Sequence, residues 1–210
     1  FNAPINLLVQ KVGPALAAGN AVVVKPHPAA TRVALQVAQL FIQAGLPAGL
    51  FNVVTGDRDA AQALVRDELV MAVTFTGGTA AGDALVRAAG AKKFLAELGS
   101  NAANIVLADA DIEAAAKRIA GAAFEASGQQ CISAQRVIVE APVYDQFLQV
   151  FVTAAKALKV GDPADESVDV GPMVSLASAQ RVMGMMADAI ARGARYALQP
   201  TQQRSEEHTS

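Results

Sequence analysis

Four places in the sequence carry side chains that could do chemistry. Cys131 is the only cysteine among 210 residues and lies in the polar stretch GQQCIS. Glu97 follows an apolar run in FLAELGS, and Lys25 ends the apolar run AVVVK. The turn TGGT, at residues 76–79, comes directly after the apolar run MAVTF. These residue types offer a nucleophile, a general base, a cation and a turn that could bind phosphate.

The lone cysteine has three ordinary uses: a buried apolar side chain, a metal ligand or a nucleophile. One cysteine and two histidines are too few for a structural zinc cluster, so we predict no metal site. A single cysteine cannot form an internal disulfide, which favours a reducing compartment, and we expect a cytoplasmic protein. The polar neighbours of Cys131 favour a reactive thiol, whereas most free cysteines are buried, and both alternatives stay open on this pattern alone.

Glu97 and Lys25 each have a functional and a structural interpretation. A carboxylate in apolar surroundings is costly unless it is paired or used, and burial would raise the pKa of Glu97 as a general base requires. The alternative is a partly exposed glutamate at a strand end. Lys25, at the carboxyl end of a parallel strand, would point into the crevice where open α/β sheets bind ligands. The alternative is a lysine that extends its ammonium group into solvent.

The two glycines of TGGT, Gly77 and Gly78, would let a phosphate approach the backbone where a helix begins. The N–H groups and the dipole at a helix N-terminus attract anions. A tight strand-to-helix turn without any ligand accounts for the same residues, so the turn alone does not decide the function.

Alternating apolar and helical segments would position these residues. We predict strands at 21–25, 50–55, 71–75 and 93–97 and helices at 4–18, 31–44, 59–66 and 79–89. The second half continues with a helix at 109–127, a strand at 136–140 and helices at 142–158 and 176–192. Strands separated by helices require crossover connections, which predicts an α/β fold with a parallel sheet.

The composition excludes several classes of partner. With 53% apolar residues and a net charge of −2, the chain can bury a core but has no basic footprint for nucleic acid. No apolar run reaches the roughly 18 residues of a membrane span, so we predict no membrane partner. The polar end RSEEHTS, at residues 204–210, resembles the read-through translation of a sequencing adapter, and we expect it to be non-native. The alternative is a disordered polar tail.

Taken together, the segments resemble the aldehyde dehydrogenase superfamily. FNAPINLLVQKVGPALAAGNAVVVKP resembles the family's stretch from its catalytic asparagine to its cofactor-binding lysine. GLPAGLFNVVTG and VTFTGGTAAG resemble its next two strand-turn units, LAELGSNAANIVL its glutamate signature and GQQCIS its cysteine signature. KVGDPADESVDVGPMVS resembles the loop that follows. These six motifs occur in the family's order over roughly residues 1–195, which leaves little room for chance.

The resemblance implies an oxidoreductase that converts a small aldehyde to a carboxylic acid with NAD or NADP. The thiolate of Cys131 would add to the aldehyde, giving a thiohemiacetal and, after hydride loss, a thioester. Asn2 would donate to the oxyanion, and Glu97 would activate the water that hydrolyses the thioester. Phe1 and Ile5 would flank the site. The residues implied to bind the cofactor are Lys25, Thr76, Gly77, Gly78, Leu98 and Gly99.

The resemblance also implies the domain organisation. Residues 1–98 would form a partial NAD(P)-binding domain with a parallel Rossmann-like sheet and flanking helices, and residues 99–203 a partial α/β catalytic domain that carries the nucleophile. The full-length parent would be a homodimer or homotetramer. Because family segments on both sides are missing from the 210 residues, we expect this chain to be inactive by itself.

Three departures and two alternatives qualify the resemblance. Pro28 stands where many members have a glutamate that grips the adenosine ribose, which makes NADP plausible beside NAD. Gly78 replaces a common serine, and Ser100 replaces a glycine. A relative that passes the thioester to coenzyme A is one alternative, against which Glu97 argues. A non-catalytic scaffold is the other, and the presence of an asparagine, a glutamate and a cysteine at the expected places argues against it.

Overall fold

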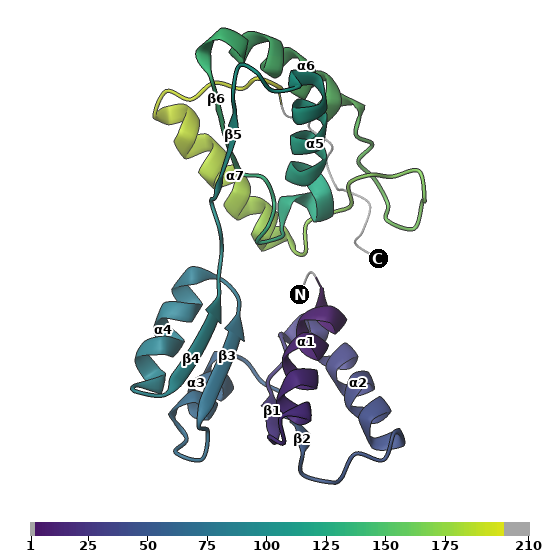
Figure 1. The fold of residues 1–210 in the computed structure, drawn as a ribbon, viewed down its shortest axis with the longest axis vertical. Helices are drawn as coiled ribbons and strands as arrows, with labels where there is room; N and C mark the ends of the chain where they lie inside the picture. Colours follow the sequence, from purple (N-terminus) through teal and green to yellow (C-terminus); the bar gives the residue numbers. More distant parts are fainter. Residues whose placement is uncertain (1–2, 200–210) are drawn as a thin grey trace. The chain divides into compact units, whose positions relative to one another are not determined.

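The computed structural model describes residues 3–199. Asn2, the expected oxyanion donor, and Phe1 lie outside the described residues, as does the expected non-native tail at 204–210. The chain divides into two compact units, with the boundary between Gly99 and Ser100. Each unit has its own helices and strands (Figure 1).

The first unit alternates helices with short strands. It contains α1 (Pro4–Ala17), β1 (Val22–Val24), η1 (Pro28–Ala30), α2 (Thr31–Gln43), β2 (Phe51–Val53), α3 (Arg58–Arg66), β3 (Ala72–Thr76), α4 (Thr79–Ala89) and β4 (Lys93–Glu97). Strand β1 pairs with β2 and β3 pairs with β4, both in parallel. Helices α2 and α4 make the crossovers that parallel pairing requires. This arrangement confirms the predicted α/β class with parallel strands.

The second unit is also built from strands that alternate with helices. It contains β5 (Ala103–Val106), α5 (Ile112–Phe124), η2 (Glu125–Gly128), β6 (Arg136–Val139), η3 (Ala141–Val143), α6 (Tyr144–Ala157) and α7 (Leu176–Ala191). Strand β5 pairs in parallel with β6, and α5 connects them.

Three details differ from the sequence prediction. Strand β5 was not predicted. The predicted helix at 109–127 ends as an α-helix at Phe124, because the residues after it turn into a left-handed conformation. Within residues 3–199 the strands form three separate parallel pairs rather than one continuous sheet.

Each unit has a small core between its helices and strands. In the first unit Val65, Leu85 and Ala89 are buried against β3 and β4. In the second unit Phe147 of α6 is buried beside Val106 and α5, and its ring stacks on Phe151 at 5.7 Å between centroids. Burial of such side chains contributes about 1.5–3 kcal/mol each.

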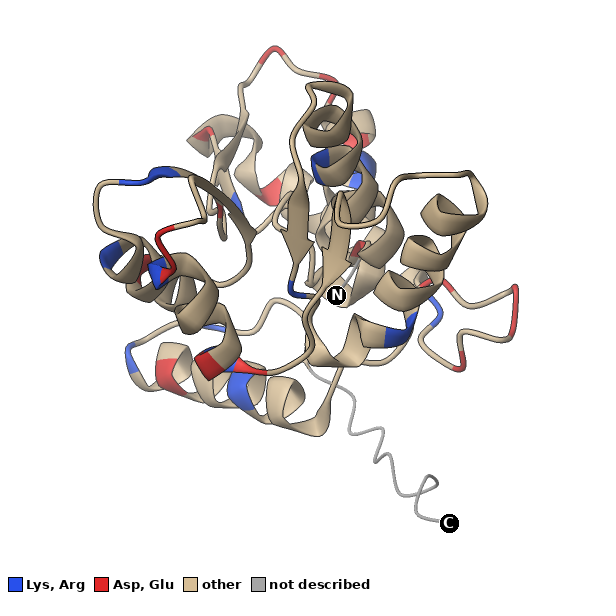
Figure 2. Ribbon diagram, turned by 90° about the horizontal axis from the view of Figure 1, so that it is seen from below, with Lys and Arg blue, Asp and Glu red and all other residues tan. Residues whose placement is uncertain are grey.

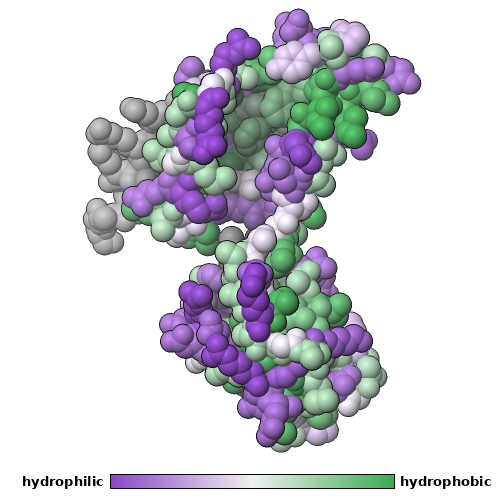
Figure 3. Space-filling view, turned by 90° about the vertical axis from the view of Figure 1, so that its left-hand side faces the viewer, coloured by the Kyte–Doolittle hydropathy of each residue, from purple (hydrophilic) through white to green (hydrophobic). Residues whose placement is uncertain are grey.

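The strand pairs are covered on one face only. Apolar side chains on their other faces remain exposed, namely Val23, Leu95, Ile105 and Ile138. The space-filling view shows apolar residues at the surface among hydrophilic ones (Figure 3).

Charged residues are spread over the helices and loops, with both signs interspersed (Figure 2). Within residues 3–199, three exposed ion pairs join residues one helical turn apart, on α4, on α5 and at the end of α7. Exposed pairs of this kind contribute little to stability. Among the helices of residues 3–199, none is long and apolar enough to cross a membrane.

Candidate active site

The ends of β3 and β4 bring together the predicted phosphate turn and the predicted general base. Thr76 and Glu97 are register partners at the carboxyl ends of these parallel strands. The N–H of Gly77 donates to the carbonyl oxygen of Glu97 at 3.0 Å, which continues the ladder by one residue. The sequence therefore places the turn and the glutamate side by side through strand register.

The hydroxyl of Thr76 is buried without a partner. Within the described residues, Thr76 Oγ1 is the one buried side-chain oxygen or nitrogen that makes no hydrogen bond. A buried polar group without a partner costs about 1–3 kcal/mol. Such a cost is expected where a ligand supplies the missing bond, so the turn fits a group with polar atoms, such as a dinucleotide.

The glycines of this region differ in the space around them. A Cβ on Gly77 would lie 2.5 Å from Cζ of Phe75, and one on Gly82 would clash with the Leu98 side chain. These two positions therefore admit only glycine without rearrangement. Gly78, the N-cap of α4, has open space where a Cβ would be, and no side chain caps the helix there. The first N–H groups of α4 are left available to a ligand.

Lys25 follows β1 and reaches across to the end of β2. Its Nζ donates to the carbonyl oxygens of Pro26 and Gly56, both at 2.8 Å. These two bonds use two of the three N–H donors of the ammonium group. The side chain is therefore held at the carboxyl ends of β1 and β2 and does not extend freely into solvent.

A histidine two residues after Lys25 has a shifted pKa. The pKa of His27 is lowered below its ordinary value of 6.5. The larger cause is partial burial, and the smaller one is nearby positive charge, including that of Lys25. Its Nδ1 accepts a hydrogen bond from the N–H of Ala29 at 3.2 Å, which caps η1.

Glu97 is exposed within its unit. The sequence left two interpretations of this residue, a buried carboxylate and a partly exposed glutamate at a strand end. Within this unit the second is correct, because the unit's own residues do not bury Glu97. Leu98, also expected to contact the cofactor, is half-buried against Gly82, and Gly99 lies next to Thr79.

Cys131 lies in the second unit, on the loop between η2 and β6, and its side chain is exposed. The buried apolar alternative is therefore wrong for this unit. Directly before the loop, within η2, Ala126 (φ 48°) and Ser127 (φ 60°) are both in the left-handed region. A non-glycine residue in this conformation costs about 1–2 kcal/mol.

Two side chains that the sequence interpretation did not assign hold this loop. Ser127 and Gln129 form hydrogen bonds with residues 171–174. Their proximity to Cys131 in the sequence was visible, but no local pattern indicated partners more than forty residues away.

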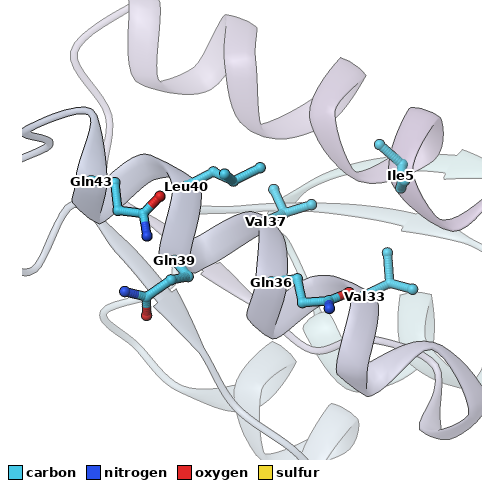
Figure 4. Close-up of a pocket in the computed structure, with 7 residues that line it drawn as sticks. All are labelled: Ile5, Val33, Gln36, Val37, Gln39, Leu40 and Gln43. Atoms are coloured by element: carbon cyan, nitrogen blue, oxygen red, sulfur yellow. The ribbon is translucent and has the colours of Figure 1, made fainter.

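A pocket of about 500 Å³ lies between α1 and α2 in the first unit (Figure 4). Its lining is formed by Ile5, Val33, Gln36, Val37, Gln39, Leu40 and Gln43. Of the residues expected near the active site, only Ile5 takes part, so this pocket does not mark the chemistry.

Comparison with known proteins identifies relatives over most of the chain. The sequence model of the aldehyde dehydrogenase family matches residues 1–209. A 3-sulfolactaldehyde dehydrogenase from Priestia megaterium is 43% identical over 199 residues, which are 94% of this chain and 42% of the relative. The chain thus spans about two fifths of the length of the curated relatives that it matches.

Solved structures agree with the family match. Lactaldehyde dehydrogenase from Escherichia coli has a TM-score of 0.90 and 37% identity, over 94% of this chain and 42% of that one. An aldehyde dehydrogenase from Pseudomonas syringae, in complex with NAD+ and octanal, has a TM-score of 0.87 and 33% identity, over 91% of this chain and 41% of that one. The fold is therefore the Rossmann-like α/β fold of these enzymes.

Proposed function

Because the chain belongs to the aldehyde dehydrogenase family, we propose that it carries the nucleophile and part of the cofactor site of an enzyme that oxidises an aldehyde to a carboxylic acid with NAD+ or NADP+. The observation that carries the proposal is the exposed thiol of Cys131, on a loop held between a left-handed turn and a strand. A thiol placed in this way is open to attack an electrophile.

The chain's own residues supply the covalent chemistry. The thiolate of Cys131 adds to the aldehyde carbonyl and forms a carbon–sulfur bond, while the carbonyl oxygen becomes an oxyanion. The backbone N–H of Cys131 and the side-chain amide of Asn2 donate to that oxyanion. NAD(P)+, when bound, accepts the hydride whose loss converts the adduct to a thioester.

Glu97 completes the reaction in this proposal. Its carboxylate takes a proton from water, the hydroxide adds to the thioester carbonyl, and the carbon–sulfur bond breaks to release the acid and the Cys131 thiolate. The exposure of Glu97 leaves its carboxylate accessible to water. A branch that transfers the acyl group to coenzyme A does not need this base, so we propose the hydrolytic reaction.

The cofactor would be held by the first unit. The ammonium group of Lys25 has one N–H left for a ribose, and the buried hydroxyl of Thr76 lacks a partner. Gly77, Gly78 and the start of α4 offer backbone donors to phosphate. Pro28 brings no carboxylate to the start of η1, so a 2′-phosphate would meet no repulsion there, and we propose that NADP+ is accepted as well as NAD+.

We further propose the setting in which the enzyme works. An exposed and unpaired cysteine suits a reducing compartment, and we expect the cytoplasm. We expect the complete enzyme to be a homodimer or homotetramer, and the 210-residue chain by itself to be inactive. Two relatives are named for small polar aldehydes, 3-sulfolactaldehyde and lactaldehyde, and we propose these as the first substrates to assay.

The test uses the complete enzyme, with the flanking coding sequence restored. Formation of NAD(P)H is followed with a panel of small aldehydes, without coenzyme A. Cys131→Ala should abolish turnover while cofactor binding stays measurable. Glu97→Gln should let a thioester on Cys131 accumulate, seen by mass spectrometry as the added acyl group, because its hydrolysis slows by about 10²–10⁴-fold. Equal turnover in the wild type and Cys131→Ala would overturn the assignment of the nucleophile, and strict dependence on coenzyme A would overturn the hydrolytic reaction.

A further inference from the structure

The chain approaches Cys131 through three consecutive residues in the left-handed conformation. The φ angles are 48° at Ala126, 60° at Ser127 and 68° at Gly128. Glycine adopts this conformation freely, whereas alanine and serine do not. In the described part of the chain, Ala126 and Ser127 are the only non-glycine residues with positive φ. Such a turn persists only where surrounding contacts hold it.

Two side chains of the turn bind a segment that lies more than forty residues later. The hydroxyl of Ser127 donates to the carbonyl oxygen of Gly171 at 2.7 Å. The side-chain oxygen of Gln129 accepts from the N–H of Val174 at 2.9 Å. The amide nitrogen of Gln129 donates back to the carbonyl oxygen of Ala126 at 2.9 Å. One glutamine therefore connects the strained turn to residues 171–174.

A second anchor follows the cysteine. The N–H of Gln130 donates to Oγ of Ser133 at 3.2 Å, and the N–H of Ser133 donates to the carbonyl oxygen of Gln130 at 3.1 Å. The N–H of Ala134 donates to the carbonyl oxygen of Ala122 at 3.2 Å, which joins the loop to α5. Because the Cys131 side chain is exposed, packing around it does not place the thiol, and these backbone anchors do.

We propose that Gln129 and Ser127 are positioning residues, which hold the Cys131 loop against residues 171–174 and so fix the place of the thiol. The proposal rests on the proposed function, in which Cys131 is the nucleophile. A displacement of about 1 Å in a reacting group can cost about 100-fold in rate. Loss of the Gln129 bonds should therefore lower kcat about 10- to 100-fold and leave the KM values for aldehyde and cofactor within about threefold.

The first experiment measures the placement of Cys131 without any turnover. The chain has one cysteine, so a nitroxide spin label can be attached there alone. Gln129→Met keeps the length of the side chain and removes the hydrogen bonds to Ala126 and Val174 described above. Gln149→Met makes the same substitution at an exposed position of α6 and is the matched control. The label should move at least about twofold faster in Gln129→Met and at the wild-type rate in the control, with similar melting temperatures in all three proteins.

The second experiment measures kcat and KM of the same variants in the complete enzyme, together with Ser127→Ala. Since Ser127 and Gln129 hold the same turn, the combined loss in kcat should be smaller than the product of the single losses. Gln129→Glu keeps an oxygen that accepts from Val174 but places a carboxylate oxygen against the carbonyl oxygen of Ala126, so the turn should loosen and kcat should fall in this variant too. It also provides a second variant if Gln129→Met does not fold.

The outcomes separate this proposal from the proposed function. Wild-type label mobility in both Gln129 variants would overturn the positioning role, and so would an unchanged kcat beside a mobile label. If the unsubstituted complete enzyme oxidises no aldehyde, the proposed function fails, while the label still decides whether Gln129 fixes Cys131.

Discussion

Replacing Thr76 with valine should make the cofactor-free protein more stable. The substitution keeps the branched shape at the end of β3 and removes a buried hydroxyl that has no hydrogen-bond partner. The unsatisfied group costs about 1–3 kcal/mol, and valine suits a strand at least as well as threonine. In a unit of this size a change of about 1 kcal/mol in the free energy of unfolding shifts the melting temperature by about 4–8 °C, so the melting temperature should rise by at least about 4 °C.

Cofactor affinity should change in the opposite direction. If the hydroxyl bonds the cofactor, its loss removes about 0.5–1.5 kcal/mol and weakens affinity about 2- to 12-fold.

Thr74→Val is the matched control on the same strand. Oγ1 of Thr74 is exposed and accepts a hydrogen bond from Nζ of Lys11 at 3.1 Å, so its removal should lower stability slightly. Calorimetric unfolding of this chain without cofactor, and titration of NAD+ and NADP+ into the complete enzyme, measure the two effects. A lower melting temperature of Thr76→Val would refute the view that the hydroxyl is unsatisfied. An unchanged affinity for both cofactors would refute its role in the site.

Three further substitutions test the surroundings of the site. Gly78→Ser places a hydroxyl in open space at the N-cap of α4, where it can donate to a bound phosphate. Cofactor affinity should therefore rise up to about tenfold in calorimetric titrations, and an unchanged affinity would contradict phosphate binding at this turn. His27→Asn should flatten the loss of stability on acidification. Folding lowers the pKa of His27, so its contribution to the stability of the folded state is complete above about pH 6.5 and is lost at lower pH, where the imidazole takes up a proton. If this is wrong, melting curves of the variant and the wild type will respond in the same way between about pH 7 and about pH 5. Ala126→Asn should raise the free energy of unfolding by about 0.5–1 kcal/mol in urea titrations, because asparagine tolerates the left-handed conformation; a decrease would contradict the strain assigned there.

The sequence was sufficient to predict the elements of the first unit. The valine run of β1, the glycines after α1, α2 and α4 and the apolar spacing of α1 are local signals. Each α-helix and strand of the unit lies within a few residues of its predicted bounds, whereas η1 was not predicted. Lys25 and the turn after β3 follow from this pattern, because parallel strands place their carboxyl ends at one edge.

Long-range contacts account for what the sequence did not predict. Strand β5 is four residues long and is defined by its pairing with β6, in the register Ala103↔Arg136. The residues after Phe124 have the composition of a helix end, and local propensity favours continuing the helix. The hydrogen bond that Ser127 donates to Gly171 and the one that Gln129 accepts from Val174 favour the left-handed turn instead. The exposure of Cys131 depends on this turn, so a local pattern could not have decided it.

The two hydrogen bonds of Lys25 have a consequence for the entropy of ligand binding. A free lysine side chain has about 2 kcal/mol of rotamer entropy, which is lost when its ammonium group becomes fixed. Here the carbonyl oxygens of Pro26 and Gly56 already fix that group before any ligand arrives. A ribose that meets the remaining N–H would bind a preorganised donor, and its affinity would not be reduced by the ordering of this side chain.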